Sequence, residues 1–271
     1  MSPGAVHVAL DDRGWRLAMG LRPLDEADWL EVDDRREGEL AMKERLLAER
    51  RDAVVATRPA GDAPSAELLD LVRAWLRAHH PGLETSVDAG EHPIVAASRL
   101  VQEDLCVLVR SDTWRLEAAS VCFPSRWLLA DKIGATLDQI HSPVPGYDEQ
   151  LGRPTTSVFE RLRPDRAYWR LNWTLLDRPD LHQPETARDA VEGPVSDWSF
   201  RVERQTIRAL ESTGAVVFTI RTHVRPLAEM LARRDGFAGN LLRALDQAPE
   251  PMRDYKGWRD VAQRLRAEGA A

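Results

Sequence analysis

The pattern of hydrophobic and polar positions divides the chain into a strand-rich centre with helical segments on both sides. Five stretches are rich in β-branched and aromatic residues and predict strands: Cys106–Arg110, Trp114–Phe123, Ala167–Leu176, Trp198–Leu210 and Ala215–Val224. Only residues 111–113 separate the first two stretches, a spacing that predicts a β-hairpin. We therefore expect the centre of the chain to form an antiparallel sheet.

Apolar residues at helical spacing predict helices before, between and after these strands. The expected helical segments cover residues 24–55, 65–80, 96–104, 127–140 and 156–162, with loops at 59–64 and 86–93. Ser65 is the expected N-cap of the second helix, which Pro81-Gly82 ends. The C-terminal tail is also predicted to be helical, with breaks at Gly236 and at Pro249-Glu250-Pro251. This order favours an α+β fold, with helices packed over an antiparallel sheet.

Composition and charge restrict the classes of partner. Charged residues make up 30% of the chain and hydrophobic residues 43%, a balance typical of a globular protein. The formal net charge of -7 disfavours nucleic acid and acidic bilayers as partners. No uncharged stretch approaches the ~20 residues of a membrane helix, and the first residues do not resemble an export signal. We expect neither nucleic acid nor a membrane as a partner.

The two cysteines, Cys106 and Cys122, are each flanked by apolar residues. Their number and spacing resemble neither a disulfide framework nor a metal knuckle. The simplest interpretation is two buried thiols in reduced form. This favours a reducing compartment, the cytoplasm.

Common catalytic signatures are absent from the sequence. It contains no GxGxxG, Walker loop, HExxH or GxSxG motif, so hydrolases, kinases and nicotinamide-binding folds lose support. The seven histidines include no pair at i, i+4 spacing, and local sequence therefore does not indicate a metal site with several histidines.

His141 is the histidine with the most distinctive surroundings. It follows an amphipathic segment that ends at Ile140, and the rigid stretch Ser142–Gly146 fixes the direction of the chain after it. An imidazole at a helix end beside an apolar surface can coordinate haem iron, which needs one proximal ligand from the protein. The alternative is a helix-terminal histidine that bonds a carbonyl.

Polar residues on the predicted strands offer a second group of candidates. In the strand 167–176, Arg170 and Asn172 share the polar face, which lies either in solvent or in a cavity where a guanidinium could bind an anion. The segment Arg201–Arg208 holds three arginines and Glu203, and Arg221 lies within an apolar strand. Such arginines either pair with carboxylates or bind a ligand such as a porphyrin, which carries two propionates.

Two strands, a helical excursion and three further strands also follow the order of a PAS domain. Six blocks of sequence resemble, in order, the haem-dependent oxidative N-demethylase family: Gly20–Leu24, Leu100–Leu105, Val121–Trp127, Ile140–Gly146, Trp169–Trp173 and Arg204–Thr206. The resemblance implies a PAS-like, five-stranded antiparallel sheet that holds haem b. We accordingly expect an N-terminal helical region over residues 1–95, a PAS-like core over 96–224 and a helical tail over 225–271.

The resemblance also implies an activity, oxidative demethylation of a small secondary amine such as dimethylamine. The products are the primary amine and formaldehyde, O2 is consumed, and electrons come from a separate NADPH-dependent flavin and iron–sulfur reductase. It implies His141 as the iron ligand, Arg170 and Asn172 on the distal side, and Glu203 as a site for the substrate ammonium. Further arginines become candidates for propionate pairing or distal donation: Arg126, Arg204, Arg208 and Arg221.

The sequence departs from the family pattern at two places. No proline occurs within Ala209–Glu211, and His223 lies near a position where an aromatic residue is expected. Two rival hypotheses remain, a PAS-like haem-binding or gas-sensing module without turnover and an interaction protein without haem. Only about 50 residues follow Val224, fewer than a typical output domain needs, which favours an enzyme over a sensor.

Overall fold

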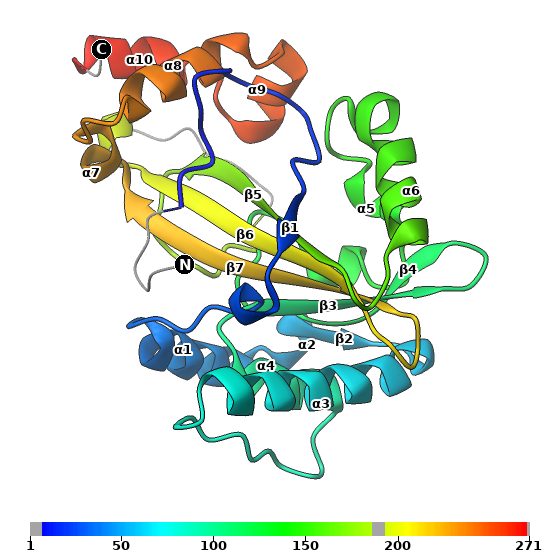
Figure 1. The fold of residues 1–271 in the computed structure, drawn as a ribbon. Helices are drawn as coiled ribbons and strands as arrows, with labels where there is room; N and C mark the ends of the chain where they lie inside the picture. The colour runs from blue at the N-terminus through cyan, green and yellow to red at the C-terminus, as the bar shows by residue number, and fades with distance from the viewer. Residues whose placement is uncertain (1–6, 186–192, 270–271) are drawn as a thin grey trace.

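A computed structural model describes residues 7–185 and 193–269 and contains one antiparallel sheet of seven strands (Figure 1). The strands lie in the order β1-β5-β6-β7-β3-β4-β2. Their bounds are β1 Arg22–Leu24, β2 Val55–Thr57, β3 Asp104–Arg110, β4 Trp114–Ser120, β5 Ala167–Leu176, β6 Ser199–Ala209 and β7 Val216–Pro226. The α+β class is confirmed. The expected number of five strands is corrected to seven, because the short edge strands β1 and β2 join the sheet.

The five predicted strands and the predicted hairpin are present. Strand β3 pairs with β4 across residues 111–113, and β6 pairs with β7 from Ser199↔Pro226 to Ala209↔Val216. The edge strands were missed because each has only three residues, too few for a recognisable alternation.

Alternation and register give the sheet two distinct faces. Glu203 lies opposite Asn172 on β5 and belongs to what we call the Arg170 face. Its neighbour Arg204 pairs with Arg221 and belongs to what we call the Arg221 face. Residues of β6 therefore go alternately to one face and the other.

Most of the helices cover the Arg221 face. The helices α1 (Arg36–Glu49), α2 (Arg51–Val54), α3 (Asp62–His79) and α4 (Pro93–Leu100) form one core with β3, β4 and β7. The helices α7 (Leu227–Leu231), α8 (Phe237–Gln247), α9 (Glu250–Lys256) and α10 (Val261–Ala267) form a second core over β5 and β6. In Figure 1 the first group is drawn in the lower part of the view and α7–α10 in the upper part.

The Arg170 face is covered by the segment between β4 and β5. This segment contains the 3-10 helix Leu129–Asp131, α5 (Leu137–His141), the π-helix Asp148–Gly152 and α6 (Arg153–Arg161). Leu137 and Phe159 from this segment pack with Cys106, Ile207 and Val216 of the sheet. The candidate site lies between this cover and the strands β5 and β6.

The expected helix over residues 24–55 is wrong for its first part. Helix begins only at Arg36, and the preceding segment is mainly irregular although it buries Trp29 and Leu30. The side chain of Glu103 accepts the backbone N–H of Glu31 at 2.7 Å, and Gln102 accepts that of Asp33 at 3.3 Å. These bonds satisfy backbone groups that a helix would otherwise satisfy.

The expected helix over 127–140 is also largely wrong. Gly134 donates its N–H to the carbonyl of Leu116 at 2.7 Å, and Leu116 donates to Ala135 at 3.1 Å. This part of the segment therefore bonds to β4. Helix α5 starts after it, where Thr136 and Gln139 form a capping box.

The remaining helices differ from expectation mainly at their ends. Helix α3 starts at Asp62, and Ser65 is not its N-cap, since its hydroxyl donates to the Gly61 carbonyl at 2.6 Å. The predicted breaks in the tail are confirmed, because Gly236 has a positive φ of 82° before α8 and Pro251 lies in the first turn of α9.

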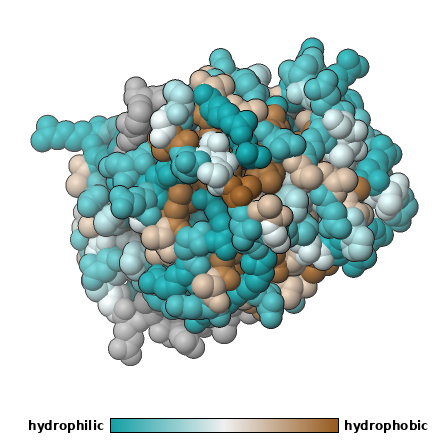
Figure 2. Space-filling view, turned by 90° about the horizontal axis from the view of Figure 1, so that it is seen from below, coloured by the Kyte–Doolittle hydropathy of each residue, from teal (hydrophilic) through white to brown (hydrophobic). Residues whose placement is uncertain are grey.

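Hydrophilic residues cover most of the face drawn in Figure 2, with hydrophobic residues in small areas between them. Within the described ranges, no helix is both long and apolar enough to cross a membrane.

Candidate functional site

His141 is the last residue of α5, in the cover over the Arg170 face. Its Nδ1 lies 2.8 Å from the carbonyl oxygen of Leu137. Because a carbonyl only accepts, Nδ1 carries the proton and Nε2 presents its lone pair in the neutral ring. Burial lowers the pKa of His141, the bond to Leu137 opposes this, and the positive charge of Arg170 lowers it further. The imidazole is thus held neutral, the form that binds a metal.

The ring of His141 is also fixed by stacking. The ring of Tyr147 lies parallel to it within 10°, with 4.5 Å between centroids. Tyr147 directly precedes the π-helix and is 3% exposed, so its own position is set by packing. The stretch Ser142–Gly146 therefore reverses the direction of the chain, so that Tyr147 stacks on His141.

Arg170 on β5 is a half-buried cation whose Nε has no direct partner in the described part of the chain. Its Nε is buried and has no hydrogen-bond partner among the described residues. Burial lowers the pKa of Arg170, and the negative charge of Glu203 raises it. A buried guanidinium without paired donors costs free energy, so its retention points to an anion or polar ligand as its partner.

Glu203 is the centre of a polar cluster on the same face. Its Oε2 accepts from Asn172 Nδ2 at 3.3 Å and from Gln205 Nε2 at 3.1 Å. Its Oε1 lies 3.4 Å from Nε of Arg201, whose guanidinium also donates to the carbonyls of Leu181 and Phe123. With 13% of its side chain exposed, the carboxylate is held in place and remains accessible.

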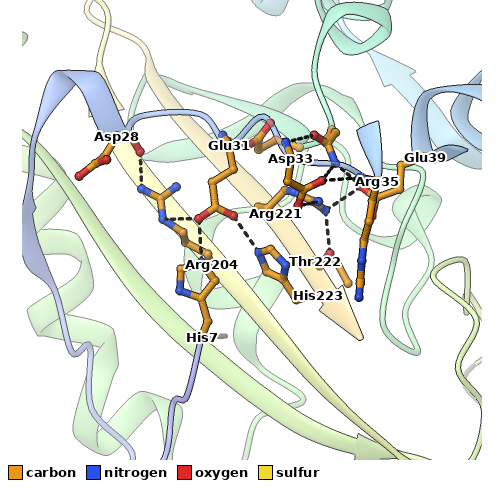
Figure 3. A network of polar contacts seen from close by, with 12 residues as sticks. His7, Asp28, Glu31, Asp33, Arg35, Glu39, Arg204, Arg221, Thr222 and His223 are labelled. Atoms are coloured by element: carbon orange, nitrogen blue, oxygen red, sulfur yellow. Dashed lines mark hydrogen bonds and ion pairs between the residues drawn. The ribbon is translucent and has the colours of Figure 1, made fainter. Parts of the chain in front are cut away.

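The structure thus brings His141, Arg170, Asn172 and Glu203 to one face of the sheet, and it separates three other predicted site residues from them. Arg204, Arg208 and Arg221 lie on the Arg221 face (Figure 3 shows two of them). Their parity on the strands accounts for this, since neighbouring residues of a strand point to opposite faces.

These three arginines have partners within the protein. Arg221 contacts Asp33 and Glu39, both at 2.7 Å. Arg208 lies 2.9 Å from Glu26 and over the ring of Trp29. Arg204 donates to the carbonyls of Asp28 and Trp29. These contacts support the alternative that the three arginines pair with groups of the protein. Their positions do not support the predicted roles in propionate binding or in catalysis.

Arg126 occupies a third position, at the start of the segment that covers the Arg170 face. It pairs with Asp177, and its N–H donates to the Gln183 carbonyl at 2.6 Å. Its φ of 61° lies in the left-handed region, which non-glycine residues seldom adopt. Its predicted role in cofactor binding is not tested by these contacts.

Several residues of the site were not identified from the sequence. His182 resembles His141 in its bonding, since its Nδ1 lies 2.8 Å from the Cys122 carbonyl. Its Nε2 is buried without a hydrogen-bond partner among the described residues. Nothing in its local sequence distinguishes it. Arg201 and Gln205 lie two residues from Glu203 on the same strand, so their side chains point to the same face. The sequence therefore could have grouped these three residues.

Glu103, in one of the blocks that carry the resemblance, is a fully buried acid beneath the N-terminal segment. Its Oε1 accepts the N–H of Glu31, while its Oε2 has no hydrogen-bond partner among the described residues. Burial raises the pKa of Glu103 to about 7, against the lowering effect of the Arg221 charge. The folded protein therefore binds this proton more tightly than the unfolded chain does.

We expect Glu103→Gln to flatten the dependence of stability on pH. The raised pKa makes the wild-type free energy of unfolding fall as pH rises from 4.5 to about 7, by up to about 3 kcal/mol. A glutamine has no such proton, so the variant gains stability relative to wild type as pH rises. Urea unfolding at pH 5 and pH 8 measures the difference. Equal changes in the two proteins would contradict the prediction.

The donor set on the Arg170 face fits a haem group. It offers one neutral imidazole with an open nitrogen, a half-buried guanidinium whose Nε has no partner among the described residues, and an apolar surface that includes Phe218 and Ile140. These features come from two strands and one helix that lie far apart in sequence.

Comparison with known protein families gives an independent result. The sequence matches the family described as haem-dependent oxidative N-demethylase, alpha subunit-like, over residues 82–266. The match covers well over half of the chain and includes His141, Arg170, Asn172 and Glu203. The resemblance noted from the sequence blocks is confirmed. We conclude that this chain belongs to the haem-dependent oxidative N-demethylase, alpha subunit-like family.

Proposed function

We propose that this protein is a haem-dependent monooxygenase that demethylates a small secondary amine such as dimethylamine. The products are the primary amine and formaldehyde, and O2 and external electrons are consumed. The observation that carries the proposal is the position of Glu203, a partly accessible carboxylate on the same sheet face as Arg170, the face that the segment with His141 covers. Glu203, which could bind a cation, thus lies on the same side of the sheet as Arg170 and His141, which could bind a cofactor.

The residues of the Arg170 face have distinct roles in this proposal. Haem b, when bound, supplies oxygen activation. His141 holds the iron through Nε2, and Tyr147 keeps its ring in orientation. Arg170 would provide positive charge on the same face, which would stabilise negative charge that develops during the reaction. Glu203 binds the substrate ammonium, and Asn172 fixes the direction of its carboxylate.

We also propose that residues 96–224 form a PAS-like core, with the helical regions 1–95 and 225–271 packed against it. Two long strands, β3 and β4, precede the helical segment, and three long strands, β5, β6 and β7, follow it. All five are neighbours in the sheet, and the intervening segment covers one face. This arrangement supports the proposal, because in a PAS domain the helical segment and one face of the sheet enclose the ligand.

The electrons are proposed to come from a separate NADPH-dependent flavin and iron–sulfur reductase. The sequence carries no recognisable flavin or iron–sulfur motif, and the family description as an alpha subunit points to further subunits. The free, buried thiols of Cys106 and Cys122 suit a reducing compartment, and we propose the cytoplasm.

A haem-binding or gas-sensing module without turnover is the alternative. It requires His141 and Arg170 but gives Glu203 no function. Purified protein should show a Soret band after haem reconstitution, and the band should shift on addition of dimethylamine. With O2 and a reductant, the protein should release formaldehyde from the amine. A Soret band without formaldehyde would favour the sensor, and no Soret band would remove both haem functions.

A further inference from the structure

Three residues that are remote in sequence meet on the Arg221 face. Nε2 of His7 lies 2.7 Å from Oε1 of Glu31, and Nε2 of His223 lies 2.8 Å from Oε2 of the same carboxylate. The two imidazole rings are 4.9 Å apart (Figure 3). All three side chains thus direct a ligand atom toward a common centre.

Each of the three side chains is held by a different part of the fold. His223 lies on β7, paired with Val202 of β6. Glu31 lies between β1 and α1, and its backbone N–H is fixed by the buried Glu103 at 2.7 Å. His7 belongs to the segment before β1 and is 8% exposed. The cluster therefore connects the N-terminal segment to the middle of the sheet.

We propose that His7, Glu31 and His223 form a binding site for a divalent transition-metal ion of the zinc class. Two imidazole nitrogens and one carboxylate form a common protein ligand set for such ions, which leaves further positions for water. All the ligand atoms lie within 4.8 Å of one another. Two ligands about 2.1 Å from a zinc ion at the tetrahedral angle are about 3.4 Å apart. The observed separations of 2.7 and 2.8 Å must therefore widen by roughly 0.6 to 0.7 Å, which rotation of the side chains can supply.

The surrounding charges are compatible with a cation at this place. The carboxylate of Glu31 lies between the two imidazoles and offers one oxygen to each of them. Nε of Arg204 approaches Glu31 to 3.4 Å, but other nitrogens of this guanidinium donate to main-chain carbonyls. Arg221 is paired with Asp33 and Glu39.

The proposed site is independent of the haem proposal. His223 shares the face of Arg204 and Arg221, while Arg170 and Glu203 lie on the other face, which the segment with His141 covers. A metal bound here would hold the segment that carries His7 against the sheet. It would raise the stability of the folded chain, because ions that bind only the folded state favour that state.

The test is zinc titration of the full-length, haem-reconstituted protein after chelator treatment. Isothermal titration calorimetry is expected to give one zinc ion per chain, and zinc should raise the melting temperature. His7→Gln, Glu31→Gln and His223→Gln should each weaken binding at least about tenfold. His7→Gln is the safest of these variants, because His7 lies outside every helix and strand. The Soret band should persist in all of them.

Two control variants separate this site from adventitious binding. His92→Gln removes a histidine that lies 3.2 Å from Asp62 near the surface, and it should bind zinc as the wild type does. His79→Gln combined with His80→Gln removes the only adjacent histidine pair in the sequence and should also have no effect. X-ray absorption at the zinc edge should show two imidazole ligands. The proposal is overturned if the wild type does not bind zinc, or if only the control variants lose binding.

Discussion

Replacing His141 with alanine is expected to abolish the Soret band of the reconstituted protein. Its Nδ1 is bonded to the Leu137 carbonyl, which leaves Nε2 as the nitrogen that could bind iron. Alanine offers no such nitrogen, and retention of haem by apolar contacts alone is weak. Absorption spectra after reconstitution and desalting measure the loss. Since His141 is the last residue of the short helix α5, the variant should still fold, which circular dichroism checks.

His182→Ala is the matched control for this experiment. Both histidines bond a carbonyl through Nδ1, but His182 lies on the loop after β5 and its Nε2 is buried. Its replacement should leave the Soret band in place. A band that survives in His141→Ala and disappears in His182→Ala would show that the ligand is the loop histidine.

The second large effect is expected from Arg170→Met. This substitution should raise the free energy of unfolding and lower kcat. Without haem, the half-buried guanidinium has no partner at Nε among the described residues, so a side chain of similar length without charge should raise the free energy of unfolding. With haem, loss of the positive charge should lower kcat for amine demethylation about 100-fold or more. A residue retained at a cost in stability is typical of a functional site.

Urea unfolding of the haem-free protein and formaldehyde release by the haem-loaded protein measure the two effects of Arg170→Met. Arg166→Met is the control, since Arg166 is exposed just before β5 and should affect neither quantity. A less stable variant with full activity would mean that Arg170 serves the fold alone. A variant with both a lower free energy of unfolding and a lower rate of formaldehyde release would mean that a partner within the protein, and not a ligand, pairs with the Arg170 guanidinium.

The sequence predicted the strands better than the helices, for a physical reason. Residues 167–176 alternate regularly between apolar and polar, and β5 has those bounds. The helical pattern over 127–140 was less reliable, because Gly134 donates its N–H to the carbonyl of Leu116 in β4 and the carbonyl of Ala135 accepts the N–H of Leu116. Such long-range partners override local preference and cannot be read from spacing.

The sequence predicted some residues of the candidate site but did not show which of the predicted arginines lie away from it. Strand parity already separates Glu203 from Arg204, because adjacent residues of a strand point to opposite faces. Parity does not say which face lies beneath the helix of His141. That depends on how the segment between β4 and β5 packs, and this packing left Arg204, Arg208 and Arg221 on the other face.

The sequence by itself determined the α+β class, the five long strands with their hairpin, and the residues through which the family is recognised. Local alternation and order along the chain are enough for these. Only the tertiary structure decided that Glu203 and Arg170 lie on the face that the segment between β4 and β5 covers, and that His7, Glu31 and His223 meet on the opposite face. Such meetings depend on strand register and on which helices cover each face, and these follow from packing between segments that are distant in sequence.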